Sequence, residues 1–208
     1  QRIPRIVHDL SIAQGKQVAL EFSGETTELD KTVLEKIGDP LVHLVRNALD
    51  HGIETPDIRT SKGKSEKGTI KINASHEGGY VILRISDDGN GINPDKLLAT
   101  AIEKNLVAED EELSESQIHN MIFLPGLSTS NEVSDISGRG VGMDVVKRNI
   151  SDLGGTVDVW SEQDIGSTFT IRLPLTLAIL DGQIVRVGNQ IFIMPLHSIK
   201  ETLIFHDR

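Results

Sequence analysis

Cysteine is absent from all 208 residues of the chain. Disulfide bonds, thiolate metal sites and cysteine nucleophiles are therefore excluded. The sequence also lacks any apolar run that approaches the roughly 20 residues of a membrane span. Its first ten residues, QRIPRIVHDL, do not contain the apolar stretch of a secretory signal. Nothing points outside the cytoplasm, and we expect a cytoplasmic protein with no direct membrane insertion.

Positive charge is scarce as well. The chain carries 21 Lys and Arg against 31 Asp and Glu, a formal net charge of -10. A general nucleic-acid-binding protein would present a basic face, so we expect no nucleic-acid partner. A nucleotide is not excluded, because its site needs only local hydrogen-bond donors and a magnesium ion offsets phosphate charge. Hydrophobic residues make up 38%, so an ordinary soluble core is feasible.

The first quarter of the chain predicts two helices and a strand. Residues 1–13 are typical of the end of a helix, and residues 16–22 alternate in hydrophobicity, which predicts a strand. Residues 25–29 could be the hairpin partner of that strand. Residues 32–50 have helical periodicity, with an interruption expected near residues 38–40, because proline disfavours helix before it. The proline would then open the second helical segment.

From residue 52 onward the pattern alternates between helices and strands. Residues 52–68 are polar and predict a loop. Alternating hydrophobicity with short turns then indicates strands, whereas proline in a first turn and a Gly-Gly end indicate helices. The expected strands are 69–75, 80–86, 156–161 and 167–173, and the expected helices are 94–104, 115–122 and 141–153.

A shift in composition follows Pro174. Residues 178–180, 183–187 and 190–194 are typical of short strands separated by Asp-Gly and Gly-Asn turns. This change to β structure suggests a domain boundary. We find no internal repeat and no low-complexity tract.

One helix, LVHLVRNALDHGIE at residues 41–54, gathers polar residues on one side. An advance of about 100° per residue brings His43, Asn47, Asp50 and His51 into one sector, opposite the apolar side chains. The plain alternative is a solvated helix face, but such faces usually carry Lys and Glu. An Asn flanked by two His is better suited to a ligand, since Asn offers a neutral oxygen to a hard cation and His can move a proton near neutral pH.

A second polar group, SDDGNG at residues 86–91, follows an apolar strand. The plain alternative is a tight turn, for which Asp-Gly-Asn-Gly is well suited. In the functional interpretation, Asp87 accepts a hydrogen bond from an exocyclic amine. Gly89 and Gly91 would then let the backbone approach a flat base.

A third group, SGRGVGMD at residues 137–144, leads directly into a helix. Glycine-rich backbone at a helix N-terminus can bind an anion, because its free N–H groups and the helix dipole both point at the ligand. The segment resembles a dinucleotide G-x-G-x-x-G loop only loosely, and it lacks the Lys-Ser/Thr of a Walker loop. Such a loop is weak evidence when taken alone.

The order of these groups resembles the four nucleotide-binding motifs of one ATPase superfamily. The helix Asn, DDGNG, GRGVG and GSTFTIRLP follow one another as in DNA gyrase, the ninety-kilodalton heat-shock chaperone, MutL and the histidine kinases. HLVRNALDHGIE and SGRGVGMDVVKRNI narrow the resemblance to the CheA family of chemotaxis histidine kinases. FLPGLSTS, at residues 123–130, resembles a further lid motif of that family. The resemblance extends from about residue 16 to the end of the chain.

This resemblance implies a fold and a domain order. The fold would be an α/β (α+β) two-layer sandwich, in which a mixed, mostly antiparallel sheet is covered by helices on one face. Residues 94–140 would form a mobile ATP lid. Residues 1–13 would end the dimerisation helices, residues 14–174 would form the ATP-binding catalytic domain, and residues 175–208 would begin a regulatory domain related to CheW.

The resemblance also implies roles at the adenine end of a nucleotide. Asp87 would read the adenine amine. Gly89 and Gly91 would lie beside the base, with Thr168 near it, and Lys96 would reach the phosphates.

Further roles follow at the phosphate end. Asn47 would bind magnesium, and His51 would reach the metal through water. His43 would contact the γ-phosphate or act as a base, with Asp50 beside it. The glycine loop would wrap the triphosphate with Ser137, Gly138, Arg139, Gly140, Val141, Gly142 and Met143.

The implied activity is transfer of the γ-phosphate of Mg-ATP to a histidine on a separate phosphoacceptor domain in two-component chemotaxis signalling. The implied partners are that domain, CheW and chemoreceptors through the full regulatory domain, and a second copy in a homodimer. None of the seven histidines of the chain has the helical-bundle context of the acceptor.

Two other functions remain open at this point. An ATP-hydrolysing switch of the gyrase or MutL kind usually has a Glu before the helix Asn, where this chain has His43. A non-catalytic nucleotide-binding adaptor is disfavoured by the intact Asn47, Asp87 and glycine loop.

Overall fold

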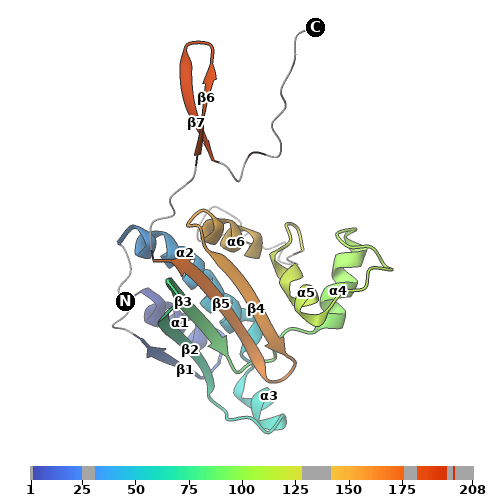
Figure 1. Cartoon of the computed structure of the whole chain (residues 1–208). Helices are drawn as coiled ribbons and strands as arrows, with labels where there is room; N and C mark the ends of the chain where they lie inside the picture. Colours follow the sequence, from blue (N-terminus) through green and yellow to red (C-terminus); the bar gives the residue numbers. More distant parts are fainter. Residues whose placement is uncertain (1, 25–30, 128–141, 176–181, 196–198, 200–208) are drawn as a thin grey trace. The chain divides into compact units, whose positions relative to one another are not determined.

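The computed structural model describes residues 2–24, 31–127, 142–175, 182–195 and 199 (Figure 1). Its contacts divide the chain into two units, Gln1–Leu175 and Thr176–Arg208. Within the described residues, no helix has the length and apolar character needed to cross a membrane.

Five strands of the first unit form one mixed sheet in the order β1-β2-β3-β5-β4. β1 (Val18–Ser23) runs parallel to β2 (Gly68–Glu77). The remaining pairs are antiparallel and join β2 to β3 (Tyr80–Asp87), β3 to β5 (Gly166–Pro174) and β5 to β4 (Thr156–Glu162). The mixed, mostly antiparallel sheet expected from the sequence is confirmed.

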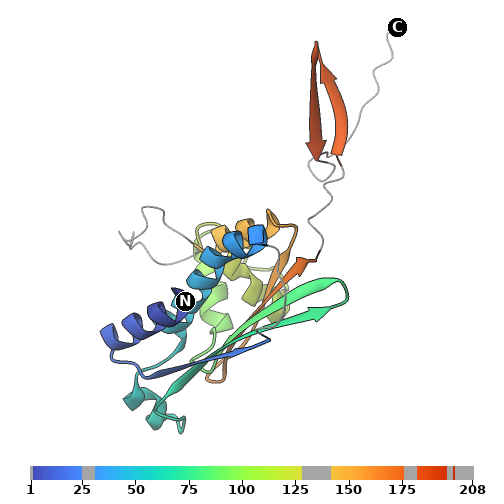
Figure 2. The ribbon, with the colours of Figure 1, turned by 90° about the vertical axis from the view of Figure 1, so that its left-hand side faces the viewer.

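The sheet has one buried face, because successive side chains of a strand point to opposite sides. Figure 2 shows the helices gathered on that side of the sheet. On β3 and β5 the buried residues that face the helices alternate along the chain: Val81, Leu83, Ile85, Phe169, Ile171 and Leu173. Ile82, on the opposite face of β3, is buried as well. The opposite face carries no helix within the described residues.

Three helices cover the buried face: α1 (Arg2–Ala13), α2 (Lys31–Asn47) and α6 (Met143–Ser151). Each is amphipathic and turns its apolar stripe toward the sheet. Together they add the following side chains to the core that the strands form: Val7, Ile37, Leu44, Val45, Val146 and Ile150.

The interruption expected at residues 38–40 is wrong, because α2 continues through Pro40. Proline removes one backbone hydrogen bond from a helix interior. Here, however, Pro40 is itself buried, and Ile37 and Leu44 are fixed in the core at 1% and 0% exposure. Packing on the sheet therefore outweighs the local preference.

The loop expected over residues 52–68 contains a short helix, α3 (Pro56–Ser61). Pro56 occupies its first turn, a position where the missing N–H has no cost. A helix of 6 residues is too short to show an apolar period, so the polar composition concealed it.

Two helices beyond the β4 edge of the sheet form a small core of their own (Figure 1). α4 (Pro94–Glu103) and α5 (Glu115–Asn120) are followed by a 3-10 turn, Met121–Phe123. A capping box between Ser114 and Gln117 fixes the start of α5. The lid expected over residues 94–140 is thus described up to residue 127, and its mobility stays a prediction.

The described part of the second unit is a hairpin of β6 (Gly182–Val187) and β7 (Gln190–Pro195). Residues 25–29 and 178–180, both expected as strands, lie outside the described residues. The assignment of residues 1–13 and 175–208 to neighbouring domains stays a prediction.

Candidate functional site

The three polar groups found in the sequence meet near the C-terminal end of α2. Asn47, the last residue of α2, donates from Nδ2 to the Sδ atom of Met143 at 2.9 Å. Met143 begins α6, so this contact joins the first group to the third. Five residues later, the carbonyl of Gly52 accepts from the N–H of Asn90 at 2.8 Å. This second contact joins the helix to the turn that follows β3.

A π-helical turn, Ala48–Gly52, lies between these two contacts. Its widened winding carries the N–H of Ile53 to the carbonyl of Ala48 at 2.7 Å. Turns of this kind are rare and frequently lie at functional sites. Here the turn ends α2 so that Asn47 and Gly52 face different parts of one site.

Asp87 is the most perturbed acid of the site. Burial is the main cause that raises the pKa of its carboxyl to about 6, and the neighbouring charge of Asp88 adds to it. The backbone N–H groups of Gly89 and Ser167 and the charge of Lys64 oppose this rise in pKa. The N–H of Gly89 donates to Asp87 Oδ1 at 3.0 Å. A buried carboxyl of this kind, with few partners of its own, is suited to bind a ligand donor.

Glycines enclose Asp87 where side chains would not fit. A Cβ atom on Gly89 would lie 2.2 Å from the carbonyl oxygen of Gly52, and one on Gly91 would lie 2.1 Å from that of Glu162. Gly91 also has a φ of +69°, which favours glycine. The two glycines therefore let the turn after β3 pack closely on the backbone of Gly52 and Glu162, and their place beside a flat base stays a prediction.

Replacement of Gly89 by alanine is expected to reduce the free energy of unfolding by about 1–3 kcal/mol, as overpacking does, and to weaken nucleotide binding. The new methyl group meets backbone atoms of Gly52 and Ile53, which cannot rotate away. The matched control is Gly38→Ala in α2, where a Cβ would meet nothing within 4 Å and stability should rise by up to about 1 kcal/mol. Chemical unfolding of both variants decides this, and equal stabilities would contradict the close packing.

His43 lies half-buried on α2, one turn before Asn47. Burial is the main cause that lowers its pKa, and Arg46 lowers it further, whereas Asp50 and Asp144 act in the opposite direction. The ring is therefore neutral at pH 7. It can donate one hydrogen bond and accept another.

Asp50 lies in the π-helical turn and is held by a residue outside the site. The π-helical turn rotates it, and its Oδ1 accepts from Gln14 Nε2 at 2.6 Å. Its carboxylate acts on His43 through charge alone. His51 is exposed, and its part in metal binding stays a prediction.

The N-terminus of α6 offers free backbone donors. Gly142 is the N-cap of this 9-residue helix, and the N–H groups of Val145 and Val146 already donate to its carbonyl. The N–H groups of Met143 and Asp144 can receive an anion, although the carboxylate of Asp144 stands in the same first turn. Gly142 and Met143 are described. Ser137, Gly138, Arg139, Gly140 and Val141 lie outside the described residues.

The strand register corrects the position expected for Thr168. Its hydroxyl donates to Ser86 Oγ at 3.0 Å, on the face of the sheet away from Asp87. The residue paired with Asp87 is Ser167, which is 6% exposed and contacts Ser161 Oγ at 3.0 Å. Strand alternation could have indicated Ser167, because side chains two apart share a face.

Lys96 remains apart from the other candidates. It is exposed in the first turn of α4. Its backbone N–H donates to Asn93 Oδ1, and its side chain makes no hydrogen bond or ion pair within the described ranges. Sequence reasoning also missed Arg59, Lys62 and Lys64, which contact the turn after β3. Their segment was interpreted as a solvated loop.

The residues fit a nucleotide with magnesium held by its phosphates. The described residues contain no group of three or more His, Asp or Glu that could hold a metal ion. Mg²⁺ is commonly bound through one or two protein oxygens together with substrate phosphates. Asn47 Oδ1 can supply one such oxygen beside the N-terminus of α6.

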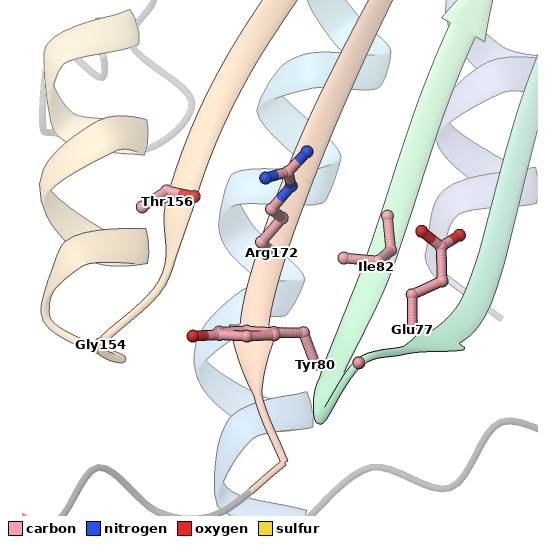
Figure 3. Close-up of a pocket in the computed structure, with 7 residues that line it drawn as sticks. Glu77, Tyr80, Ile82, Gly154, Thr156 and Arg172 are labelled. Carbon is pink, nitrogen blue, oxygen red and sulfur yellow. The ribbon is translucent and has the colours of Figure 1, made fainter.

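A hollow of about 560 Å³ lies at the other end of β3 (Figure 3). Glu77, Tyr80, Ile82 and Arg172 line it, on the face of the sheet turned away from the helices. Tyr80 begins β3, whereas Asp87 ends it. This hollow contains none of the predicted site residues and is separate from the candidate site.

Comparison with known proteins agrees with this arrangement. Residues 36–177 match the family described as histidine kinase-, DNA gyrase B-, and HSP90-like ATPase. The chain is 50% identical over 203 residues to the chemotaxis protein CheA of Rhizobium meliloti, covering 98% of this chain and 27% of that protein. It is 50% identical over 202 residues to CheA of Salmonella typhimurium, covering 97% of this chain and 30% of that protein.

A solved structure has the same fold. Full-length ShkA, in a crystal structure with AMPPNP, matches 85% of this chain and 29% of its own length, with a TM-score of 0.53 and 21% identity. The chain spans less than a third of the length of the two CheA proteins that it matches, 27% and 30% respectively.

Proposed function

Because the chain belongs to the family of histidine kinase-, DNA gyrase B- and HSP90-like ATPases, we propose that it binds Mg-ATP and transfers the γ-phosphate to a histidine on a separate domain. One observation carries the proposal. Asn47, the N-terminus of α6 and the turn from Asp87 to Gly91 come together around a single helix end. The similarity to CheA proteins supports a place in chemotaxis signalling.

The adenine end is bound by Asp87 and its glycines. An ionised carboxylate at Asp87 accepts a hydrogen bond from the exocyclic amine. Gly91, which packs on the backbone of Glu162, lies beside the ring. Ser167, whose backbone N–H bonds to Asp87, helps to fix the direction of the carboxylate.

The phosphates are bound at the N-terminus of α6. Its free N–H groups and the helix dipole favour anionic oxygens. Asn47 Oδ1 would hold magnesium together with phosphate oxygens, and the bound ion would neutralise charge on the triphosphate. Lys96 and the glycine loop at residues 137–141 would add further phosphate contacts, and His51 would reach the metal through water.

The transfer step requires little covalent chemistry from the chain, because positioning and charge neutralisation supply most of the catalysis. A neutral imidazole nitrogen of the acceptor attacks the γ-phosphorus in line. The new N–P bond forms as the bond to the β,γ-bridging oxygen breaks, and ADP leaves with that electron pair. The acceptor's other ring nitrogen releases its proton to solvent. His43, being neutral, donates a hydrogen bond to a γ-phosphate oxygen.

The partners follow from the CheA relatives and are proposals for this chain. The acceptor histidine lies on a phosphoacceptor domain. Residues 175–208 begin a CheW-like domain through which CheW and chemoreceptors act, and residues 1–13 end the helices that make a homodimer. A hydrolysing switch of the gyrase kind is less well supported, because neutral His43 stands where such enzymes place a Glu.

Replacement of Asn47 by alanine is expected to weaken Mg-ATP binding at least tenfold, since even residues that only support a metal ligand cost about 10–100-fold when removed. Binding of metal-free ATP should change much less. Calorimetric titrations with magnesium and with a chelator measure both. Asn73→Ala on β2 is the control, because among the described residues its side chain bonds to Ser23 alone, on the open face of the sheet. Equal losses with and without magnesium would exclude the metal role.

A further inference from the structure

Four charged residues around α3 surround the turn that carries Asp87. We name Glu54, Arg59, Lys62 and Lys64 the α3 clamp. Arg59 and Glu54 are buried at 1% and 4% exposure, and Arg59 Nη1 lies 3.0 Å from Glu54 Oε2. The other two are lysines on the segment after the helix.

The clamp contacts each of three successive residues of the turn. Arg59 Nη2 binds Asp88 Oδ2 at 3.0 Å, and Lys64 Nζ donates to the carbonyls of Asp88 at 3.0 Å and Gly89 at 2.7 Å. Lys62 Nζ donates to Asn90 Oδ1 at 2.6 Å. The turn is thus held from one side by three cations.

Lys62 also connects this turn to the one between β4 and β5. It pairs with Asp164 Oδ1 at 2.5 Å, while the backbone N–H of Asp164 donates to the carbonyl of Asn90 at 2.7 Å. Both turns flank the carboxylate of Asp87. A shift in either would move the acceptor that the base requires.

The charges within the cluster balance. Arg59, Lys62 and Lys64 face Glu54, Asp88 and Asp164. Burial alone would raise the pKa of Glu54, but its backbone hydrogen bond, Lys64 and Arg59 hold that pKa below its usual range. Such buried pairs add little net stability compared with apolar packing, so their value here lies in the geometry they fix.

We propose that the α3 clamp positions the base-reading turn and thereby sets the preference of the site for adenine. Arg59, Lys62 and Lys64 are positioning residues that act through Asp88, Gly89 and Asn90 on the bond from Gly89 N–H to Asp87 Oδ1. The inference rests on the proposed function, because it assumes that Asp87 reads the base.

The test compares ATP with inosine triphosphate, which has an oxygen where adenine has its amine. Calorimetry of the whole chain gives the ratio of the two dissociation constants, that of inosine triphosphate divided by that of ATP. The variants are Arg59→Lys, Lys62→Met and Lys64→Met, and the control is Lys67→Met. Lys67 is an exposed lysine of the same segment, and its side chain makes no hydrogen bond or ion pair with the described residues.

The ratio is expected to fall about tenfold in Lys64→Met, the value of one well-aligned hydrogen bond. Lys62→Met and Arg59→Lys should follow the same direction, and Lys67→Met should keep the wild-type ratio. A purely structural role would instead lower the unfolding temperature and weaken both nucleotides in proportion. If Arg59→Lys fails to fold, Lys62→Met decides, because its side chain is 35% exposed.

The experiment distinguishes failure of the proposed function from failure of the clamp proposal. Wild-type protein that binds both nucleotides equally would overturn the role of Asp87, and with it the proposed function. Wild-type protein that prefers ATP, with folded clamp variants that keep the full ratio, would overturn the clamp alone.

Discussion

Asp87→Asn is expected to weaken ATP binding by the chain at least about 100-fold. The substitution removes the charge-assisted acceptor, and it turns an amide donor toward the donor of the adenine amine. A buried polar group left without a partner costs about 1–3 kcal/mol, to which the lost hydrogen bond adds. Calorimetry with Mg-ATP measures the effect.

The matched control is Asp158→Asn, an exposed aspartate on β4. It loses the same charge and should keep the wild-type affinity. If Asp87→Asn also binds ATP normally, Asp87 does not read the base.

The pH dependence gives the same variant a second readout. A carboxyl whose pKa rises from 3.8 to about 6 binds its proton more tightly in the folded state than in the unfolded state. Its contribution to stability is therefore fully present below pH 3.8 and is lost as the pH rises through about 6. About two pKa units correspond to roughly 3 kcal/mol.

Asp87→Asn should consequently lack this decrease and be more stable than wild type at pH 7.5, although it no longer binds ATP. Adenosine binding to wild type should strengthen from pH 5 to pH 7.5, because only the ionised carboxylate accepts the amine well. Adenosine has no phosphate that titrates in this range. A difference in stability between wild type and Asp87→Asn that does not change between pH 4 and pH 7 would contradict the raised pKa of this carboxyl.

Strongly patterned segments were predicted well from the sequence. The hairpin of β2 and β3 and the pair of β4 and β5 alternate over most of their lengths, so their buried faces were evident, although β3 buries Val81, Ile82 and Leu83 in succession. Short or interrupted elements were predicted poorly. α2 runs through Pro40 because its neighbours pack in the core, and local propensity carries no information about that packing.

Prediction of the site was limited by register and winding. The motifs indicated Asn47 and Asp87, but no α-helical wheel shows that a π turn rotates Asp50 toward Gln14. The strand register likewise decides between Thr168 and Ser167. The residue of β5 that lies beside Asp87 was therefore misplaced by one position, and the partner of Asp50 was missed because its helix changes winding.

The clamp could not be predicted from its own segment. Arg59, Lys62 and Lys64 stand in a polar stretch that is typical of a solvated loop. Their partners in the turn after β3 lie 24 to 29 residues away in the chain, so only the folded sheet brings the two segments together.

The chain by itself is expected to bind ATP without phosphorylating itself. His43 and His51 belong to the proposed site, and His119 is buried at 3% exposure. His8 and His76 lie on α1 and β2 and have no bundle around them. In-line transfer requires reacting atoms to approach within about 3–3.5 Å in an aligned pose, which none of these described histidines offers.

A phosphoacceptor domain from a CheA protein, added in solution, should restore the transfer. The reaction should be slow, because an untethered domain loses the roughly millimolar effective concentration that a short linker provides. An acceptor with its histidine replaced by glutamine is the control and should remain unlabelled.

The most direct test of phosphotransfer to a separate domain is incubation of the chain and the acceptor with γ-labelled ATP, followed by assay of acid-labile, base-stable label. We predict label on the acceptor domain and none on the chain incubated alone. Stoichiometric label on the chain alone, or release of labelled phosphate without any label on the acceptor, would contradict the account.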